Sequence, residues 1–380
     1  MARRTSAAKQ LAQLAERFEP VIRDAFLAAI DDITNRAVLG EIVTAIQDGD
    51  INRAIASLGL DDAAFRPLVA AVEQAFETGG VTTAGTFPRV VERQGVRTAF
   101  RFDVRNSRAE AFLRDWSSEK VTAIAEDTRA VVRTTIQRGM VDGRNPRSTA
   151  LDLVGRVDRK TGKRVGGVIG LTPQQESWVA NARRDLNALN DLVGGPLDKI
   201  KANPYFTRKR RLSSGDKIII RKLMGGKPID ADTIEKLLTN YKSSLLQYRG
   251  EVIGRTEAIA ALNQSEHEAI NQAVEQGTVK ASQVKRVWDS AGNDGRTRES
   301  HLLMEGQTVG LNEPFTFPDG SKAMFPGDRS LGAPADETIQ CRCVARTVID
   351  WLADAKDAIS ADDRAALLAL SDNELFGGRG

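Results

Sequence analysis

Two histidines and two cysteines are the residues of this chain best suited to chemistry. They are the only residues of either type, and all lie in its last third: His267, His301, Cys341 and Cys343. Thiolates and imidazole nitrogens are preferred zinc ligands, usually in tetrahedral arrangements. Side chains alternate along a strand, so a Cys-x-Cys segment would point both sulfurs to the same face. The sequence therefore allows a zinc site at His301, Cys341 and Cys343.

The same residues also have a purely structural interpretation. Cysteines are often small buried hydrophobic residues, and the histidines could make ordinary hydrogen bonds. The Cys-x-Cys spacing is tighter than the usual gap between zinc-binding cysteines, and His267 stands on a separate predicted helix. These features favour the structural interpretation over a four-ligand zinc site. They favour it equally over a zinc site that uses His301 with Asp328.

Residues 294–301 predict a turn followed by the start of a helix. Arg298 and His301 are three residues apart and would share one helix face, where they could meet an acidic or phosphate group. The favoured alternative is that Asp294 and Thr297 cap the helix. The Arg298–His301 pair would then tie the helix to the hairpin that follows.

The sequence contains no established catalytic motif. Ser300 adjoins His301, but neighbours along a helix do not face each other. There is no Gly-x-Ser-x-Gly, no His-Glu-x-x-His and no Walker-type loop. We therefore predict that the protein is not an enzyme.

One segment, residues 208–222, carries a run of positive charge. Such a run could contact DNA phosphates, and Tyr205 and Phe206 just before it could add aromatic contacts. The slightly favoured alternative is a solvated face that pairs with an acidic protein, because 54 basic and 51 acidic residues nearly balance in the chain. The basic residues are Arg208, Lys209, Arg210, Arg211, Lys217, Arg221 and Lys222.

The composition limits the classes of protein. Of 380 residues, 41% are hydrophobic, 28% charged and only 5% aromatic, which indicates a helix-rich globular protein of two or three domains. The basic N-terminus lacks the apolar core of a secretory signal. No apolar stretch reaches the length of a membrane span, so no membrane partner is expected. Two cysteines provide no disulfide framework and indicate a reducing compartment.

Hydrophobic periodicity predicts helices over most of the chain. Pro20 should kink or split the first helix, and glycines between residues 79 and 85 should break the chain after the third. The glycine-containing stretch 158–170 predicts a loop or small hairpin. The predicted helices cover residues 8–37, 41–58, 61–77, 103–139, 145–157, 173–193, 230–247 and 250–276.

After Gly277 the pattern changes. Residues 284–288 alternate like a strand, residues 315–325 have a hairpin signature around Pro318-Asp319-Gly320, and residues 341–349 predict a last strand. The fold class is therefore mainly α, with helical N-terminal and middle regions followed by a small α+β C-terminal module. The predicted regions are 1–88, 89–250 with the basic segment, 251–350, and a C-terminal helical tail at 351–380.

An ordered series of residues runs through the C-terminal module, preceded by Arg255-Thr256-Glu257. In this order and context the series resembles the Mu F-like domain of phage minor head proteins, although Glu305 stands where the family often has Asp. The residues that carry the resemblance are Trp288, Asp294, Arg296, Arg298, His301, Gly306, Phe315, Pro326, Asp328, Cys341, Arg342 and Cys343.

This resemblance implies a minor head protein of a tailed bacteriophage or phage-like particle, acting in head morphogenesis at the portal vertex. The implied partners are the portal protein and the major capsid or scaffolding protein, and also double-stranded DNA. The implied location is the virion, in the head interior or at the portal vertex, after assembly in the host cytoplasm.

Within such a module, aromatic residues would form the core and polar residues would lock the fold. Two other functions stay open: a zinc-dependent hydrolase or nuclease that uses His301, the cysteines and Asp294 or Asp328, and a DNA-binding accessory protein that uses residues 208–222. The expected core residues are Trp288, Phe315 and Phe325, and the expected polar lock is Arg296, Arg298, His301 and Arg342.

Overall fold

Helices dominate the computed structural model, which describes residues 7–87, 91–93, 96–98, 100–208, 214–292 and 294–351. The mainly α fold class is thereby confirmed. The chain forms two compact units, each assembled from separate stretches. Unit 1 comprises the described parts of Met1–Glu16, Ala75–Ala109 and Ala258–Gly380, and unit 2 those of Arg17–Gln74 and Glu110–Glu257.

The first helices follow the predicted periodicity, with two differences. α1 (Ala7–Arg36) runs on through Pro20 without being split. The predicted helix 41–58 is in fact two helices, α2 (Leu39–Gln47) and α3 (Ile51–Ala56). They part at Gly49, whose φ of 72° lies in the left-handed region that glycine adopts without strain.

The sequence predicts that the third helix ends before Gly79 and Gly80, and this is wrong. α4 (Arg66–Ala84) passes through Gly79 and Gly80 as a continuous helix. A Cβ on Gly79 would lie 2.2 Å from Ser265 Oγ, and one on Gly80 would lie 2.2 Å from the Phe102 ring. Close packing inside unit 1, and not a turn, therefore explains glycine at these two positions.

The middle of the chain agrees with the expected helix signals. α5 (Ser107–Val141) is followed by α6 (Pro146–Val154), which the Asn145 side chain caps. Thr172 forms a capping box with Gln175 at the start of α7. The other elements here are η1 (Asp62–Phe65), β1 (Val91–Arg93), β2 (Val96–Thr98), β3 (Arg156–Val157), β4 (Arg164–Val165), α7 (Pro173–Ala188), η2 (Leu189–Leu192), α8 (Leu197–Lys201), α9 (Pro204–Thr207) and α10 (Ser214–Met224). The antiparallel pairing of β3 with β4 makes a small hairpin. A hairpin is one of the two forms that the sequence predicts for 158–170, but it begins at Arg156, within the stretch predicted as the end of the helix 145–157.

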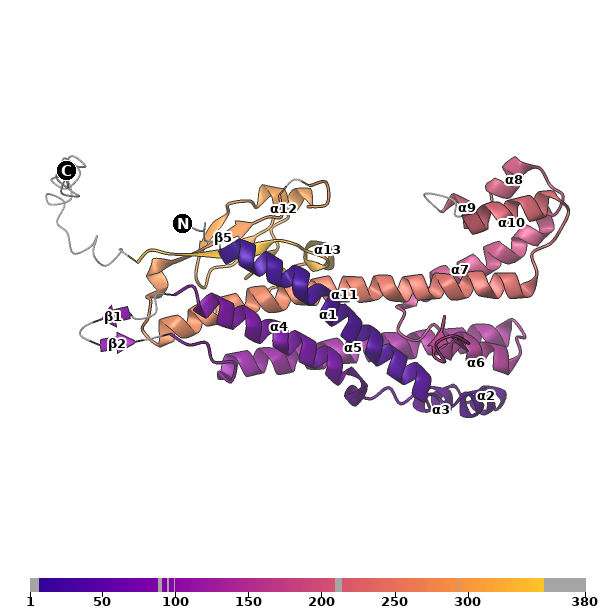
Figure 1. Ribbon diagram of the computed structural model, residues 1–380, viewed down its shortest axis with the longest axis horizontal. Helices are drawn as coiled ribbons and strands as arrows, with labels where there is room; N and C mark the ends of the chain where they lie inside the picture. Colours follow the sequence, from indigo (N-terminus) through magenta and orange to yellow (C-terminus); the bar gives the residue numbers. More distant parts are fainter. Residues whose placement is uncertain are drawn as a thin grey trace. The chain divides into compact units, whose positions relative to one another are not determined.

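α11 (Ala231–Glu275) is one uninterrupted helix of 45 residues (Figure 1). The sequence predicts two helices that part near Gly250, and this is wrong. A Cβ on Gly254 would lie 2.4 Å from the carbonyl oxygen of Glu19 in α1, and one on Gly250 would lie 3.1 Å from the Arg23 side chain. The two glycines therefore allow α1 and α11 to approach closely within unit 2.

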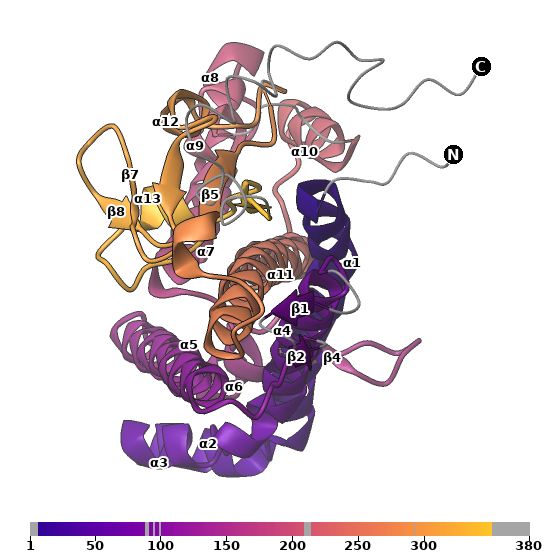
Figure 2. The ribbon, with the colours of Figure 1, turned by 90° about the vertical axis from the view of Figure 1, so that its left-hand side faces the viewer.

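The C-terminal module is built on a three-stranded antiparallel sheet in the order β6-β5-β9. β5 (Val284–Asp289) lies in the middle, between β6 (Thr308–Gly310) and β9 (Val344–Ile349). β7 (Phe315–Thr316) and β8 (Lys322–Ala323) form the predicted hairpin. The short helices η3 (Ala281–Gln283), α12 (Glu299–Leu303) and α13 (Ala335–Thr338) complete the module, and Figure 2 shows α12, α13 and the hairpin gathered around β5.

The core of unit 1 joins this module to residues from distant parts of the chain. Trp288, Phe315 and Phe325 are buried in it together with Phe317 and both cysteines. The same cluster contains Ala8, Leu11 and Ala15 of α1, and Ile259 and Leu262 of α11. The small sheet is therefore covered by helices that the sequence places hundreds of residues apart.

Two sequence predictions fall outside the described residues: the helical tail at 351–380, of which only Trp351 is described, and the basic residues Lys209, Arg210 and Arg211. Within the described part of the chain, no helix combines the length and apolar character needed to cross a lipid bilayer.

Candidate functional site

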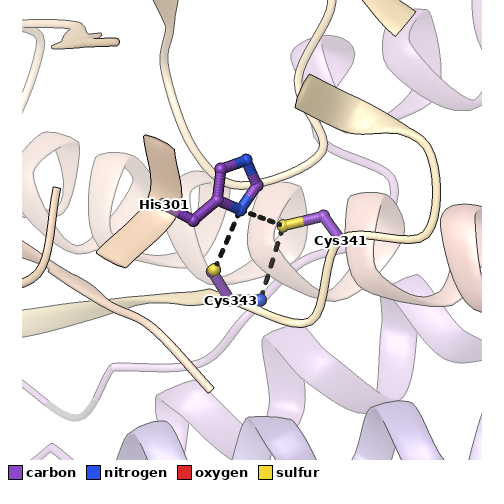
Figure 3. Close-up of side chains that lie close together, drawn as sticks. All are labelled: His301, Cys341 and Cys343. Carbon is purple, nitrogen blue, oxygen red and sulfur yellow. Dashed lines mark hydrogen bonds between the residues drawn. The ribbon is translucent and has the colours of Figure 1, made fainter. Parts of the chain in front are cut away.

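His301, Cys341 and Cys343 come together in the core of unit 1 (Figure 3). His301 Nδ1 lies 3.3 Å from Cys343 Sγ and 3.7 Å from Cys341 Sγ. All three side chains are at most 2% exposed. The other ring nitrogen, Nε2, points away from the sulfurs and lies 2.9 Å from a carboxylate oxygen of Glu337. One imidazole nitrogen therefore faces two sulfurs, and the other faces a carboxylate.

A network of hydrogen bonds positions His301 on α12. The Asp294 side chain accepts hydrogen bonds from the backbone N–H groups of Arg296 and Thr297 and thereby holds the preceding turn. Arg342 donates to both oxygens of Asp294, at 2.6 and 2.9 Å. This network joins the turn before α12 to the Cys-Arg-Cys segment.

The predicted capping of this helix is wrong in detail. α12 begins at Glu299, its N-cap is Arg298, and no side chain caps it. The Arg298 guanidinium donates instead to the carbonyl oxygen of Ile339. Arg298 and His301 thus tie α12 mainly to residues 337–343, while the His301 ring also contacts Phe317 beyond β7, with 5.7 Å between ring centroids.

The sequence predicts that both cysteines lie within the last strand, and this is wrong. They lie in an irregular segment just before β9. Strand alternation is therefore not what aligns their sulfurs. Gln340, directly before Cys341, has a φ of 56°, which is uncommon for a residue other than glycine. A local hydrogen bond from the Cys343 backbone N–H to Cys341 Sγ, at 3.4 Å, folds the segment back on itself.

Electrostatics distinguish the two thiols. A hydrogen bond from the Cys341 thiol is the largest cause that lowers the pKa of Cys343, to about 5, and His301 lowers it further. The pKa of Cys341 is raised, first by this interaction with Cys343 and then by burial. Cys343 is therefore the sulfur that most readily carries a negative charge, as a metal ligand requires.

The donor set fits three corners of a tetrahedral zinc site. With Zn–S near 2.3 Å and Zn–N near 2.05 Å, tetrahedral angles require N···S distances of about 3.6 Å. The observed distances of 3.3 and 3.7 Å bracket this value, and the three ligand atoms all lie within 4.8 Å of one another. The residues present therefore fit zinc.

His267 and Asp328, the other candidate ligands, serve other contacts. His267 Nε2 lies 3.1 Å from the carbonyl oxygen of Leu311, and burial lowers the His267 pKa to about 4. The carboxylate of Asp328 accepts from the backbone N–H groups of Met324 and Ser330. Neither joins the cluster of His301 and the cysteines.

The remaining residues of the resemblance are mostly structural. Trp288 is fully buried and meets His301 edge-on, with 5.6 Å between ring centroids. Gly306 has a φ of 76° at a turn. The carbonyl oxygen of Pro326 accepts a hydrogen bond from Asn263. Arg296 is exposed and donates through its backbone to Asp294.

Three buried polar residues support the site although no sequence motif marks them. Asn263 of α11 accepts from the backbone N–H of Ala345 at 2.8 Å and donates to the Pro326 carbonyl at 3.2 Å. Arg286, 1% exposed, donates to the carbonyl oxygens of residues 310, 313 and 324. Glu266 accepts from the backbone N–H of Thr347. Together they join α11 and the hairpin to the sheet.

The described part of the basic segment does not form one continuous cationic face. Arg208 pairs with Asp185 at 2.7 Å, and Lys222 pairs with Asp230 at 2.9 Å. Lys217 and Arg221 are exposed. Part of the charge is thus balanced within the protein.

Comparison with known proteins finds one family that is similar to part of this chain. Residues 217–346 match the family described as phage Mu protein F like protein. The chain thus contains a region, about a third of its length, that is similar to this Mu F-like family. The match begins within α10, upstream of the predicted boundary at residue 251, and ends in β9.

One further match concerns a single bacterial protein. YqbB of Bacillus subtilis (strain 168) is 31% identical over 103 residues. The matched region is 27% of this chain and 31% of YqbB, so the chain matches less than a third of that protein. No solved structure is significantly similar to this chain.

Proposed function

We propose that this protein is a minor head component of a tailed bacteriophage or phage-like particle, acting in head assembly at the portal vertex. The Mu F-like match over residues 217–346 carries the proposal. The proposed partners are the portal protein and the major capsid or scaffolding protein. The proposed location is the head interior or the portal vertex of the virion.

A docking role, not catalysis, suits the way the Mu F-like domain uses its chemically capable residues. His301, Cys341 and Cys343 are enclosed in the core of unit 1, where a polymeric substrate would not reach them. The polar network of Asp294, Arg298 and Arg342 holds segments of the domain together. A hydrolase or nuclease built on these residues is therefore the less favoured function.

Co-expression tests the proposal directly. The full chain, produced together with the portal protein of its own phage or prophage, should co-purify with it. Mass spectrometry of purified particles should find the chain at low copy number. Failure to associate with the portal protein, together with absence from particles, would overturn the proposed function.

We also propose that the domain binds one zinc ion through His301, Cys341 and Cys343, and that this zinc stabilises the fold. The support is the spacing of the three ligand atoms and their complete burial in the core of unit 1, which keeps the site away from bulk solvent. The Glu337 carboxylate beside Nε2 would orient the imidazole, as such partners commonly do for zinc ligands.

Elemental analysis of the purified chain tests the zinc proposal. One zinc per chain is expected, with loss of the metal in Cys343→Ser and in His301→Ala. His267→Gln is the matched control, because His267 lies outside the cluster, and it should keep its zinc. Absence of zinc from the unmodified chain, purified without chelator, would refute the proposal.

A contact with packaged double-stranded DNA is proposed at Lys217 and Arg221, whose side chains are exposed in the described part of the basic segment. Replacing both by Gln should weaken DNA binding and flatten its dependence on salt. Arg208→Gln is the control, because Arg208 already pairs with Asp185. Equal salt dependence in the double variant and the unmodified chain would remove this contact.

A further inference from the structure

A cavity of about 510 Å³ lies in unit 2. Side chains of α5, α6, α7 and α11 line it. Five of the lining side chains are cationic, and three carry carboxylates, so its walls have an excess of positive charge. The cations are Arg138, Arg144, Arg183, Arg184 and Lys242, and the carboxylates belong to Asp142, Asp152 and Glu176.

Three cations share a single buried carboxylate in this wall. Asp152, 4% exposed, accepts hydrogen bonds from Arg144, Arg183 and Lys242. Burial alone would raise the pKa of Asp152, but the charges of Lys242, Arg183 and Arg144 together lower it. Glu235 offsets one further charge through Arg183. The cluster is held as ions, with more positive than negative charge.

Lys242 is the residue most in need of an additional partner. Its side chain is 2% exposed, and an ammonium group has three hydrogens to donate. Within the described residues, Nζ makes one hydrogen bond, to Asp152 Oδ1 at 3.1 Å. Burial lowers the Lys242 pKa, against the pull of Asp152. A buried ammonium with donors to spare is costly unless something accepts from it.

Two more donors face the same space. Thr135 Oγ1 is buried, lines the cavity, and has no hydrogen-bond partner among the described residues. Arg184 is exposed at the rim and donates to Asn181, without a carboxylate partner in the described part of the chain. The cavity thus presents a neutral hydroxyl at depth and an uncompensated guanidinium at its edge.

We propose that this cavity binds a phosphate group. A phosphate offers several acceptor oxygens and more than one negative charge, which matches a lysine, a hydroxyl and guanidinium groups converging on one space. A volume of about 510 Å³ exceeds what a bare phosphate fills, which leaves room for a phosphate group that belongs to a larger molecule. A free nucleotide and the backbone of a nucleic acid strand are the two sources of this chemistry.

Titration calorimetry on the full chain tests the proposal. The probes are inorganic phosphate, deoxyadenosine monophosphate, and a short single-stranded oligonucleotide without terminal phosphates, all at one ionic strength. Lys242→Met should weaken binding of the mononucleotide at least about tenfold, because a charge-assisted hydrogen bond in a buried site is lost. Arg184→Gln should weaken it about two- to fivefold, as expected for a rim charge.

Arg184→Gln keeps the test valid if Lys242→Met does not fold, because it leaves every ion pair of Asp152 in place. Arg159→Gln is the control, since Arg159 is exposed on the β3–β4 turn outside the cavity. Binding of the mononucleotide that inorganic phosphate displaces supports a free ligand, and binding of the oligonucleotide alone supports a nucleic acid strand. The proposal is overturned if no probe binds, or if Arg184→Gln and Arg159→Gln bind each probe equally.

Discussion

Glu266 gives the structure a pH dependence that can be predicted in sign and size. Its carboxyl group is 3% exposed on α11. Burial raises its pKa to about 7 from an ordinary value of 4.5, against the opposing hydrogen bonds from Thr347 and the charge of Arg286. Between pH 4.5 and about 7, the carboxyl group is therefore mostly protonated in the folded protein and mostly ionised in the unfolded chain.

The size of the effect follows from the two pKa values. Their difference, 7 − 4.5 = 2.5 units, corresponds to about 3 kcal/mol at 1.36 kcal/mol per unit. Because the folded pKa is the higher one, this contribution is fully present below pH 4.5. It is lost as the pH rises through about 7.

Glu266→Gln isolates this effect. Gln is nearly the same size, stays neutral, and its carbonyl oxygen can still accept from the Thr347 backbone. The variant should match the unmodified protein near pH 4.5 and exceed its free energy of unfolding by up to about 3 kcal/mol near pH 8.5. Denaturant unfolding at several pH values measures the difference between the two proteins, in which other titrating groups such as His267 cancel.

Glu299→Gln is the control for loss of a carboxylate, because Glu299 is exposed. Its difference from the unmodified protein should change little over the same pH range. The reasoning would be refuted if the advantage of Glu266→Gln were the same at pH 4.5 and pH 8.5, or if it shrank as the pH rose.

Three further changes test the packing. Gly254→Val should lower the free energy of unfolding by about 1–3 kcal/mol, because the new side chain meets a backbone carbonyl of α1. Gly250→Ala should lower it less, because the new methyl group meets the flexible Arg23 side chain. Equal losses in the two variants would contradict the close approach of α1 and α11 at Gly254. Asn263→Ala should cost about 1–3 kcal/mol by leaving a backbone N–H of β9 unpaired, and an unchanged melting temperature would contradict this. Arg286→Met should lower the free energy of unfolding by at least about 2 kcal/mol, since buried carbonyl oxygens lose their donor. Thermal unfolding measures the effect of all three changes. An unchanged stability of Arg286→Met would show that water replaces the guanidinium.

Features determined by neighbouring residues could be predicted from the sequence. Pro318-Asp319-Gly320 indicates a tight turn by its own conformational preferences, and β7 and β8 flank it as expected. Asn145 and Thr172 mark helix starts because a cap needs only the next few backbone N–H groups. In each case the cause lies within about four residues of its effect.

Features determined by distant contacts could not be predicted in this way. Gly79 and Gly254 look like helix breakers, but each is glycine because another segment lies against it. Glu266 resembles a charge on a solvated helix face. One local signal was present: Leu262, Ala269 and Ile270, at helical spacing from Glu266, are all buried, which places Glu266 on the apolar face.

The candidate site falls between these two cases. Its three residues could be singled out because histidine and cysteine are so scarce in the chain. The way their ligand atoms come together could not be predicted, because it depends on the turn at Gln340 and on the hydrogen bond from Arg298 to the carbonyl oxygen of Ile339. Residue type thus indicated the chemistry, and only the fold showed which atoms meet.

The make-up of the unit 1 core also has a consequence for biosynthesis. Ala8 and Leu11 share that core with Trp288 and Ala345, so it cannot close before β9 has left the ribosome. At about 5–20 residues per second, roughly 15–70 seconds separate synthesis of the first and last of these residues. Throughout that time the apolar face at the start of α1 lacks its native cover. A chain that stops short of β9 would keep this face exposed, so unit 1 can reach its folded state only in copies that have been translated through β9.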